Sequence, residues 1–100
     1  MSTLKVEPRG ARARDVSVSE DTLTVELQDG RTLSAPVAWY PRLLHGTPAE
    51  RRHWRLIGNG LGIHWRDLDE DISIEGLLPG YPSNESPKSI QRWLDKRVSG

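Results

Sequence analysis

Apolar and polar side chains alternate from Asp15 to Val37, and this pattern constrains the fold more than any other feature of the sequence. The alternation is clearest from Thr22 to Gln28 and recurs on both sides of that run. A period of two with β-branched residues is typical of strands that bury one face. Asp29-Gly30 then favours a two-residue type I′ hairpin, whose two central residues both need a positive φ. The segment predicts a three-strand antiparallel meander that ends near Pro36, because proline cannot donate to a strand ladder.

The spacing of apolar residues becomes helical after the meander. Ala38 to Leu44 predicts a short helical turn with a proline in its first turn. Thr47-Pro48-Ala49-Glu50 has the sequence of a capping box, with proline at the first helical position. We therefore expect a central helix from Pro48 to about Ile57, stopped by Gly58-Asn59-Gly60. Its predicted inward residues are Trp54 and Ile57, and its predicted outward residues are Arg51, Arg52 and Arg55.

Two more short strands and a last helix complete the predicted elements. Leu61 to Trp65 and Asp71 to Glu75 alternate as strands do, and an acidic turn from Arg66 to Asp71 separates them. Tyr81 to Pro87 is rich in proline, serine and asparagine and is typical of a linker. Lys88 to Val98 predicts an amphipathic helix. Its apolar stripe consists of Ile90, Trp93, Leu94 and Val98.

A helix of this length has only marginal stability when it is isolated in water. Trp93 must therefore dock on its own domain or on another chain. The predicted fold class is α+β: an antiparallel β-meander with a central helix, two further short strands and a C-terminal amphipathic helix. The predicted organisation is a basic N-terminal segment over residues 1–14 and a single α+β domain over 15–80. A linker with a short helix follows over residues 81–100.

Charge and composition exclude several classes of function. The chain has 14 basic and 14 acidic side chains, so it is neither a bulk polycation nor a polyanion. Basic residues nevertheless gather at both ends, which indicates either ordinary solvated termini or contact with an acidic partner or nucleic acid. The absence of cysteine excludes a disulfide framework, a thiolate metal site and a cysteine nucleophile. Apolar runs far shorter than about 20 residues exclude a membrane span, and the polar start lacks the apolar core of a signal peptide. The expected compartment is the cytoplasm.

Five blocks of sequence follow one another in an ordered spacing. They are Asp29-Gly30-Arg31, Trp39-Tyr40-Pro41-Arg42-Leu43, Thr47-Pro48-Ala49-Glu50-Arg51, Gly60-Leu61-Gly62-Ile63-His64-Trp65, and Leu68-Asp69-Glu70-Asp71-Ile72 with Gly76-Leu77-Leu78. Together these blocks resemble a small bacterial family catalogued as domain of unknown function 2442. The resemblance implies a small α+β fold with strands wrapped on a helix. It also implies a gene encoded beside a short partner of another uncharacterised family, in pairs suspected to be toxin–antitoxin modules. Some relatives carry a C-terminal helix-turn-helix, for which the twenty residues after Gly80 are too few.

Neither the acidic residues nor the histidines form a metal or catalytic motif. Asp67, Asp69 and Asp71 have the spacing that opens a calcium loop, but Ile72 and Leu78 occupy the positions that need glycine and glutamate. A structural turn or a partner-facing acidic patch explains these aspartates better. The three histidines, His45, His53 and His64, fall on separate predicted elements, and His64 is expected to bond Asp69 or Asp71. We therefore predict no catalytic residue, no metal and no cofactor.

The leading functional hypothesis is a non-enzymatic protein-interaction module, resembling the antitoxin-like or regulatory member of a two-gene pair. The expected partner is a small protein from an adjacent gene, and the expected state is a monomer or weak homodimer. The predicted partner-facing residues are Asp67, Asp69, Glu70, Asp71, Ile90, Arg92, Trp93 and Leu94.

The alternative is a nucleic-acid-binding accessory domain. A small hydrolase or nuclease that uses one of the histidines is the weakest hypothesis. The predicted nucleic-acid contacts are Arg9, Arg12, Arg14, Arg51, Arg52 and Arg55.

Overall fold

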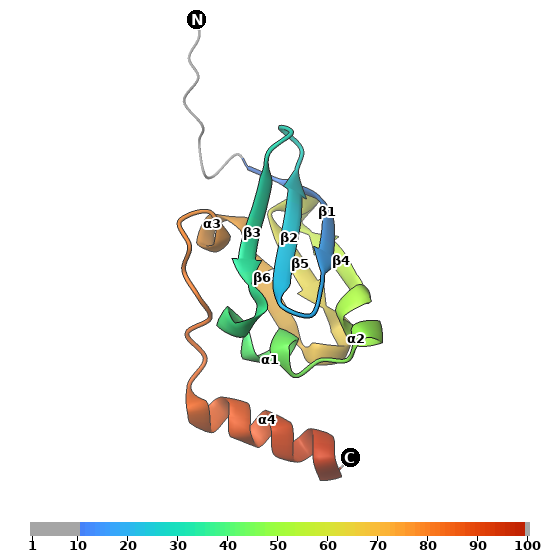
Figure 1. The fold of residues 1–100 in the computed structure, drawn as a ribbon, viewed down its shortest axis with the longest axis vertical. Helices are drawn as coiled ribbons and strands as arrows, with labels where there is room; N and C mark the ends of the chain where they lie inside the picture. The colour runs from blue at the N-terminus through green and yellow to red at the C-terminus, as the bar shows by residue number, and fades with distance from the viewer. Residues whose placement is uncertain (1–10, 100) are drawn as a thin grey trace, which may run out of the picture.

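The computed structural model describes residues 11–99 and shows two antiparallel three-strand sheets with short helices between and after them (Figure 1). The first sheet has the order β1-β2-β3 and the second the order β4-β5-β6. Apolar residues from both sheets belong to one buried core. The predicted α+β class is therefore confirmed. The strands are β1 (Ala13–Val18), β2 (Thr22–Leu27), β3 (Thr32–Pro36), β4 (Trp54–Ile57), β5 (Gly62–Trp65) and β6 (Glu70–Ser73).

The first sheet confirms the predicted meander, but its second turn differs from the prediction. Leu23, Val25 and Leu27 of β2 are fully buried, as the alternation predicts. Gly30 has a φ of 96°, whereas Asp29 is not among the residues with positive φ. The Leu27 N–H donates to the Arg31 carbonyl at 2.8 Å, and the Gly30 N–H donates to the Leu27 carbonyl at 3.0 Å. The connection is thus a three-residue loop with one left-handed glycine, in place of the predicted type I′ turn.

The predicted central helix is wrong in its second half. The helix α2 spans only Pro48–Arg52, and its capping box between Thr47 and Glu50 is formed as predicted. His53 leaves helical geometry with a ψ of 65°, and the chain continues as β4. Strand β4 pairs with β5 along its length, from Trp54 opposite Trp65 to Ile57 opposite Gly62. A ladder with a second strand outweighs the preference of a few isolated residues for a helix.

This correction changes the neighbouring segments as well. Gly58–Gly60 forms a 3-10 turn (η3) between two strands, rather than the end of a helix. Leu61, predicted to face inward, is 38% exposed because β5 begins one residue later. Strand β6 ends at Ser73, which caps the short helix α3 (Ile74–Leu77) by accepting from the Gly76 N–H. Ile74 is buried as predicted, but it is buried from a helix.

The remaining helices lie between the sheets in sequence and at the C-terminus. The predicted turn near Ala38 is present as a 3-10 turn, η2 (Val37–Trp39), and a one-turn helix, α1 (Pro41–Leu44). A further 3-10 turn, η4 (Arg66–Leu68), precedes β6. The predicted C-terminal helix is confirmed as α4 (Pro87–Ser99). It lies below the sheets at the end of an extended segment (Figure 1).

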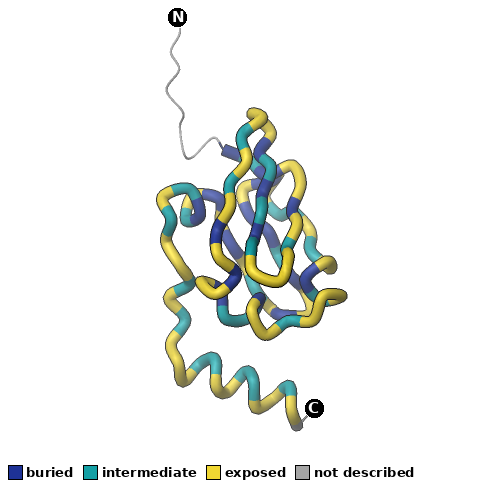
Figure 2. The backbone as a smooth tube through the Cα atoms, viewed as in Figure 1, coloured by how far each residue is buried: buried dark blue, intermediate teal, exposed yellow. Residues whose placement is uncertain are grey.

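Helix α4 is attached to the surface of the protein rather than built into the core. Its described residues are half-buried or exposed, and none is fully buried (Figure 2). Trp93 packs against the core cluster from outside, together with partly buried residues of the two sheets. Ile90 and Leu94 are also half-buried, whereas Val98, predicted to share their stripe, is 88% exposed. Of the two alternatives for Trp93, the structure shows docking on its own domain.

Arg51 joins three parts of the fold and is the one charged side chain among the fully buried residues that the structure describes. Its Nε donates to the Leu43 carbonyl at 2.8 Å, and Nη2 donates to the Leu44 carbonyl at 2.9 Å. Nη1 reaches the Ser19 carbonyl between β1 and β2 at 3.1 Å. The last carbonyls of a helix lack partners within the helix. The Leu43 carbonyl accepts from the Gly46 N–H as well, so the guanidinium adds a second donor there and supplies one to Leu44. The prediction that Arg51 faces outward is therefore wrong.

Replacing Arg51 by alanine should lower the free energy of unfolding by about 3 kcal/mol, because buried carbonyls would lose charge-assisted donors. Arg52 is the matched control, since it is the next residue of the same helix and is exposed. Arg52→Ala should change stability by less than about 0.5 kcal/mol. Urea unfolding of both variants measures the difference. Equal midpoints for the two variants would contradict the role given to Arg51.

Candidate functional site

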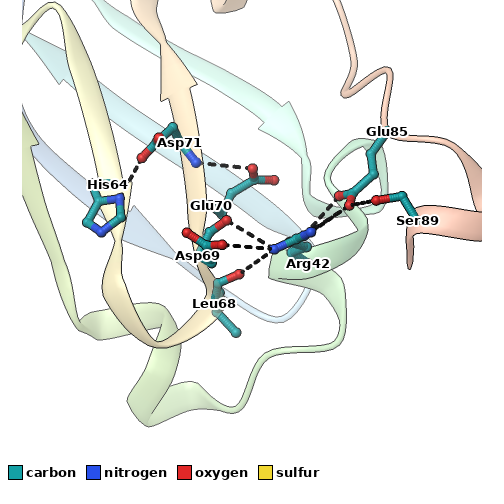
Figure 3. Close-up of polar contacts among 8 residues, drawn as sticks. All are labelled: Arg42, His64, Leu68, Asp69, Glu70, Asp71, Glu85 and Ser89. Atoms are coloured by element: carbon teal, nitrogen blue, oxygen red, sulfur yellow. Dashed lines mark hydrogen bonds and ion pairs between the residues drawn. The ribbon is translucent and has the colours of Figure 1, made fainter. Parts of the chain in front are cut away.

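Arg42 of α1 connects the acidic turn, the extended segment and α4 (Figure 3). Its Nη2 lies 2.7 Å from Glu85 Oε2, and its Nε lies 2.9 Å from Glu85 Oε1. Nη1 donates to the carbonyls of Leu68 and Asp69, at 3.3 and 3.2 Å. The Arg42 and Glu85 side chains are only 15% and 14% exposed, so this pair is shielded from solvent. Hydrogen bonds from Arg42 hold the pKa of Glu85 below its ordinary value.

Four residues at intervals of four hold α4 against the body. Glu85 accepts from Arg42 and, at 2.6 Å, from the hydroxyl of Ser89. The ring of Trp93 lies between two guanidinium groups, with Arg42 Cζ at 5.1 Å and Arg97 Cζ at 4.7 Å from its centre. We call this set the α4 clasp. It consists of Glu85, Ser89, Trp93 and Arg97, with Arg42 and Glu50 as its partners on the body.

Glu50 completes the clasp at the far end of α4. Arg97 Nη2 lies 2.8 Å from Glu50 Oε1, and Nη1 lies 3.1 Å from Oε2, a bidentate pair. Hydrogen bonds from Arg97 lower the pKa of Glu50, despite partial burial that opposes the shift. The same carboxylate accepts from the Thr47 N–H to close the capping box of α2. One glutamate therefore serves both a local helix cap and the attachment of α4.

The acidic turn is in place, but its members point in different directions. Asp67 lies 2.8 Å from His53 Nδ1, and Asp71 lies 2.5 Å from His64 Nδ1. Asp69 has a left-handed backbone and is 86% exposed in its side chain, 3.7 Å from Arg42. The expected bond from His64 is thus made to Asp71. A cationic or imidazole group therefore lies close to each of the three aspartates.

Glu70 differs from the other acidic residues because it faces inward. Strand β6 places it opposite Trp65, whose side chain is fully buried. Its Oε1 accepts from the Asp71 N–H at 3.1 Å, and its buried Oε2 has no hydrogen-bond partner among the described residues. Burial raises the pKa of Glu70 to about 7, and the nearby charges of Glu85 and Asp71 also raise it. The orientation of Glu70 does not fit the prediction that it faces a partner.

Two hollows border this network. A groove of about 210 Å³ lies between the acidic turn and α4, and it is lined by Arg42, Asp69, Ser89, Arg92, Trp93 and Lys96. A second pocket of about 420 Å³ lies between β6 and the extended segment before α4, and Glu70 is one of its lining residues. The structure therefore brings Asp69, Arg92 and Trp93 of the predicted site together at the groove. It places Glu70 in the other pocket.

The predicted nucleic-acid contacts do not gather on one surface. Arg9 lies outside the described residues. Arg12 donates to the carbonyls of Gly58 and Asn59, Arg14 pairs with Glu26, and Arg51 is buried. Arg52 and Arg55 are exposed, on α2 and β4 respectively.

Apart from Trp93, the residues of the clasp were not predicted from the sequence. They are Arg42, Glu50, Glu85, Ser89 and Arg97, and only the spacing 89-93-97 could have indicated a common face of α4. Within residues 11–99, no group of three histidine, aspartate or glutamate side chains could hold a metal ion. None of the described helices is long and apolar enough to cross a bilayer.

Two small sheets and a helix clasped to their surface define this molecule as a small α+β domain. The family described as "Protein of unknown function (DUF2442)" matches residues 13–83. The chain belongs to this family, which confirms the resemblance seen in the sequence.

Two solved structures are similar to the chain. A protein of unknown function from Rhodospirillum rubrum is 27% identical with a TM-score of 0.65, over 75% of this chain and 93% of its own. An uncharacterized protein from Chromobacterium violaceum is 26% identical with a TM-score of 0.63, over 86% of this chain and 75% of its own. No curated protein matches the chain.

Replacing Trp93 by alanine should detach α4 and leave the sheets folded, because the ring makes the central contact of the clasp. Two cation–π contacts and the lost burial together are worth about 2 kcal/mol, so exchange of α4 amides should rise about 30-fold. Hydrogen exchange followed by NMR measures this, with β2 amides as the internal reference. Arg92→Ala, an exposed neighbour on the same helix, is the control. Unchanged α4 protection in the Trp93 variant would show that the clasp does not hold the helix.

Proposed function

We propose that this protein is a non-enzymatic, cytoplasmic protein-interaction module, the antitoxin-like or regulatory member of a two-gene pair. The groove between the acidic turn and α4 is the observation that carries this proposal. It joins residues from the two segments predicted to face a partner, although Asp69 and Trp93 lie 24 positions apart in the sequence. Aromatic and arginine side chains at the centre of a surface are the usual anchors of protein interfaces.

The charges around the groove favour a particular kind of partner. Asp69 supplies an exposed carboxylate on the side of the turn, whereas Arg92 and Lys96 supply cations on the side of α4. A small protein that presents basic groups to the turn and acidic groups to the helix would complement both sides. Steric cover of such a partner needs no reaction, which agrees with the proposal that the module is not an enzyme.

The experiment is titration of the purified protein with the product of the adjacent gene, by calorimetry and by size-exclusion chromatography with light scattering. The expected result is a one-to-one complex between this chain, itself a monomer or weak homodimer, and its neighbour. Arg92→Glu should weaken the complex about tenfold, because it reverses a charge at the groove. Arg55→Glu is the matched control on β4 and should change affinity by less than about twofold.

Separate elution of the two proteins at micromolar concentration would refute the proposal. If Arg55→Glu weakened binding more than Arg92→Glu did, the partner would bind near β4 rather than at the groove, which would contradict the proposed interface. The nucleic-acid alternative predicts instead that filter binding to DNA or RNA falls steeply with salt.

A further inference from the structure

The segment that leads to α4 crosses the body over a pocket. We call residues 79–86 the strap. At its start, the Gly80 and Tyr81 N–H groups donate to the carbonyls of Leu77 and Gly76 in α3, at 3.0 and 3.2 Å. Further along, the Ser83 N–H donates to the Trp39 carbonyl at 3.0 Å, and the Tyr40 hydroxyl donates to the Tyr81 carbonyl at 3.4 Å. None of these partners belongs to a strand. The Arg42–Glu85 pair anchors its end. The pocket beneath it has a volume of about 420 Å³, and its walls include Glu70 and Glu85. The strap can therefore lift without disturbing either sheet.

Glu70 is half-buried beside this strap, in an unfavourable environment for a charge. Its Oε2 is shielded from solvent and has no hydrogen-bond partner among the described residues. Desolvation and the like charge of Glu85 together raise its pKa to about 7, from an ordinary value of 4.5. Burial, followed by the charge of Glu70, also raises the pKa of Tyr40. Burial therefore disfavours the ionised form of each of these two groups.

The charged groups around Glu70 make the Arg42–Glu85 pair sensitive to its protonation. Asp71 lies on the same strand as Glu70, and Asp69 lies in the turn before it. The other groups are Tyr40, Arg42 and Glu85, which belong to other segments. Arg42 is the one cation that interacts with it in the described structure, and it already donates to Glu85 and to two carbonyls. An ionised Glu70 would repel Glu85 and compete with it for Arg42 (Figure 3).

We propose that Glu70 is a proton-operated latch: its protonated form lets Glu85 hold the strap and α4 on Arg42, and its ionisation releases them. Release separates α4 from the acidic turn and so takes the groove between them apart. The latch therefore regulates the same surface as the proposed function and rests on it for its biological use. The carboxylic proton passes to solvent when the strap lifts, and no other chemistry is needed.

The direction of the pH dependence follows from linkage. With the strap closed the pKa of Glu70 is about 7, and with the strap lifted the carboxyl is hydrated and returns toward 4.5. The closed form therefore holds the proton more tightly, so a rise in pH between these two values favours release. One proton gives about a tenfold change in the open-to-closed ratio per pH unit, levelling off above pH 7.

Amide hydrogen exchange of the full chain tests the latch directly. Protection factors for the Ser83 and Ile90 amides, corrected for intrinsic exchange, should fall about tenfold per pH unit between pH 5 and 7. In Glu70→Gln, which cannot ionise, they should stay constant across that range. Glu75→Gln, an exposed glutamate on the neighbouring α3, should behave as the wild type does. Glu70→Met supplies a second non-ionising variant, and β2 amides report whether each variant remains folded.

Protection that is independent of pH in the wild type, or that falls equally in Glu70→Gln, would overturn the proposal. This result does not depend on any partner. If the latch is confirmed and the adjacent gene product still does not bind, only the proposed function fails. If the complex forms with equal affinity at pH 6 and 8 while the latch is absent, the proposed function stands alone.

Discussion

Neither three-strand sheet of this protein can bury its apolar face alone, and this constraint determines the rest of the structure. A sheet of three short strands has one apolar face that needs a cover, and here each sheet supplies the cover for the other. Val25 of the first sheet and Ile63 of the second are fully buried in the same core. The segment between the sheets must therefore turn tightly, which explains the one-turn helices between Val37 and Arg52. Arg51 then donates to the carbonyls at the end of α1 and so ties this turn to α2.

The attachment of α4 depends on a different kind of interaction. The sheets are held by apolar burial, whereas α4 is held by two ion pairs and an aromatic ring between two arginines. Partly exposed contacts of this kind contribute about 1 kcal/mol each, far less than the stability of a typical domain. The helix can consequently detach in a local opening that leaves the core folded. Because α4 forms one wall of the groove, its local detachment changes the surface that is offered to a partner.

The sequence predicted the elements whose signals are local and failed where tertiary pairing decides. The alternation of β2, the capping box at Thr47 and the amphipathic pattern of α4 each depend on neighbouring residues, and each is confirmed. The four residues from Trp54 to Ile57 fit a helical or a strand period equally, and only the ladder with β5 makes them a strand. The burial of Arg51 could not be predicted from the sequence either, because it depends on carbonyls from two other segments. The candidate site was predicted in part: Asp69, Arg92 and Trp93 meet at one groove, while the clasp residues on the body left no sequence signal.

The position of Glu70 shows how one register can couple the core to the surface. Pairing of β6 with β5 sets Glu70 in one row with Trp65 and, through β4, with Trp54, the row on the inner face of the second sheet. An apolar residue would satisfy this row at no cost in desolvation, so a carboxyl there breaks the local rule for a buried face. The break lies where the strap crosses the sheet and where Arg42 joins the turn to α4. Because Glu85 needs the same guanidinium that an ionised Glu70 would attract, the charge of one inward-facing side chain acts on the attachment of a whole helix.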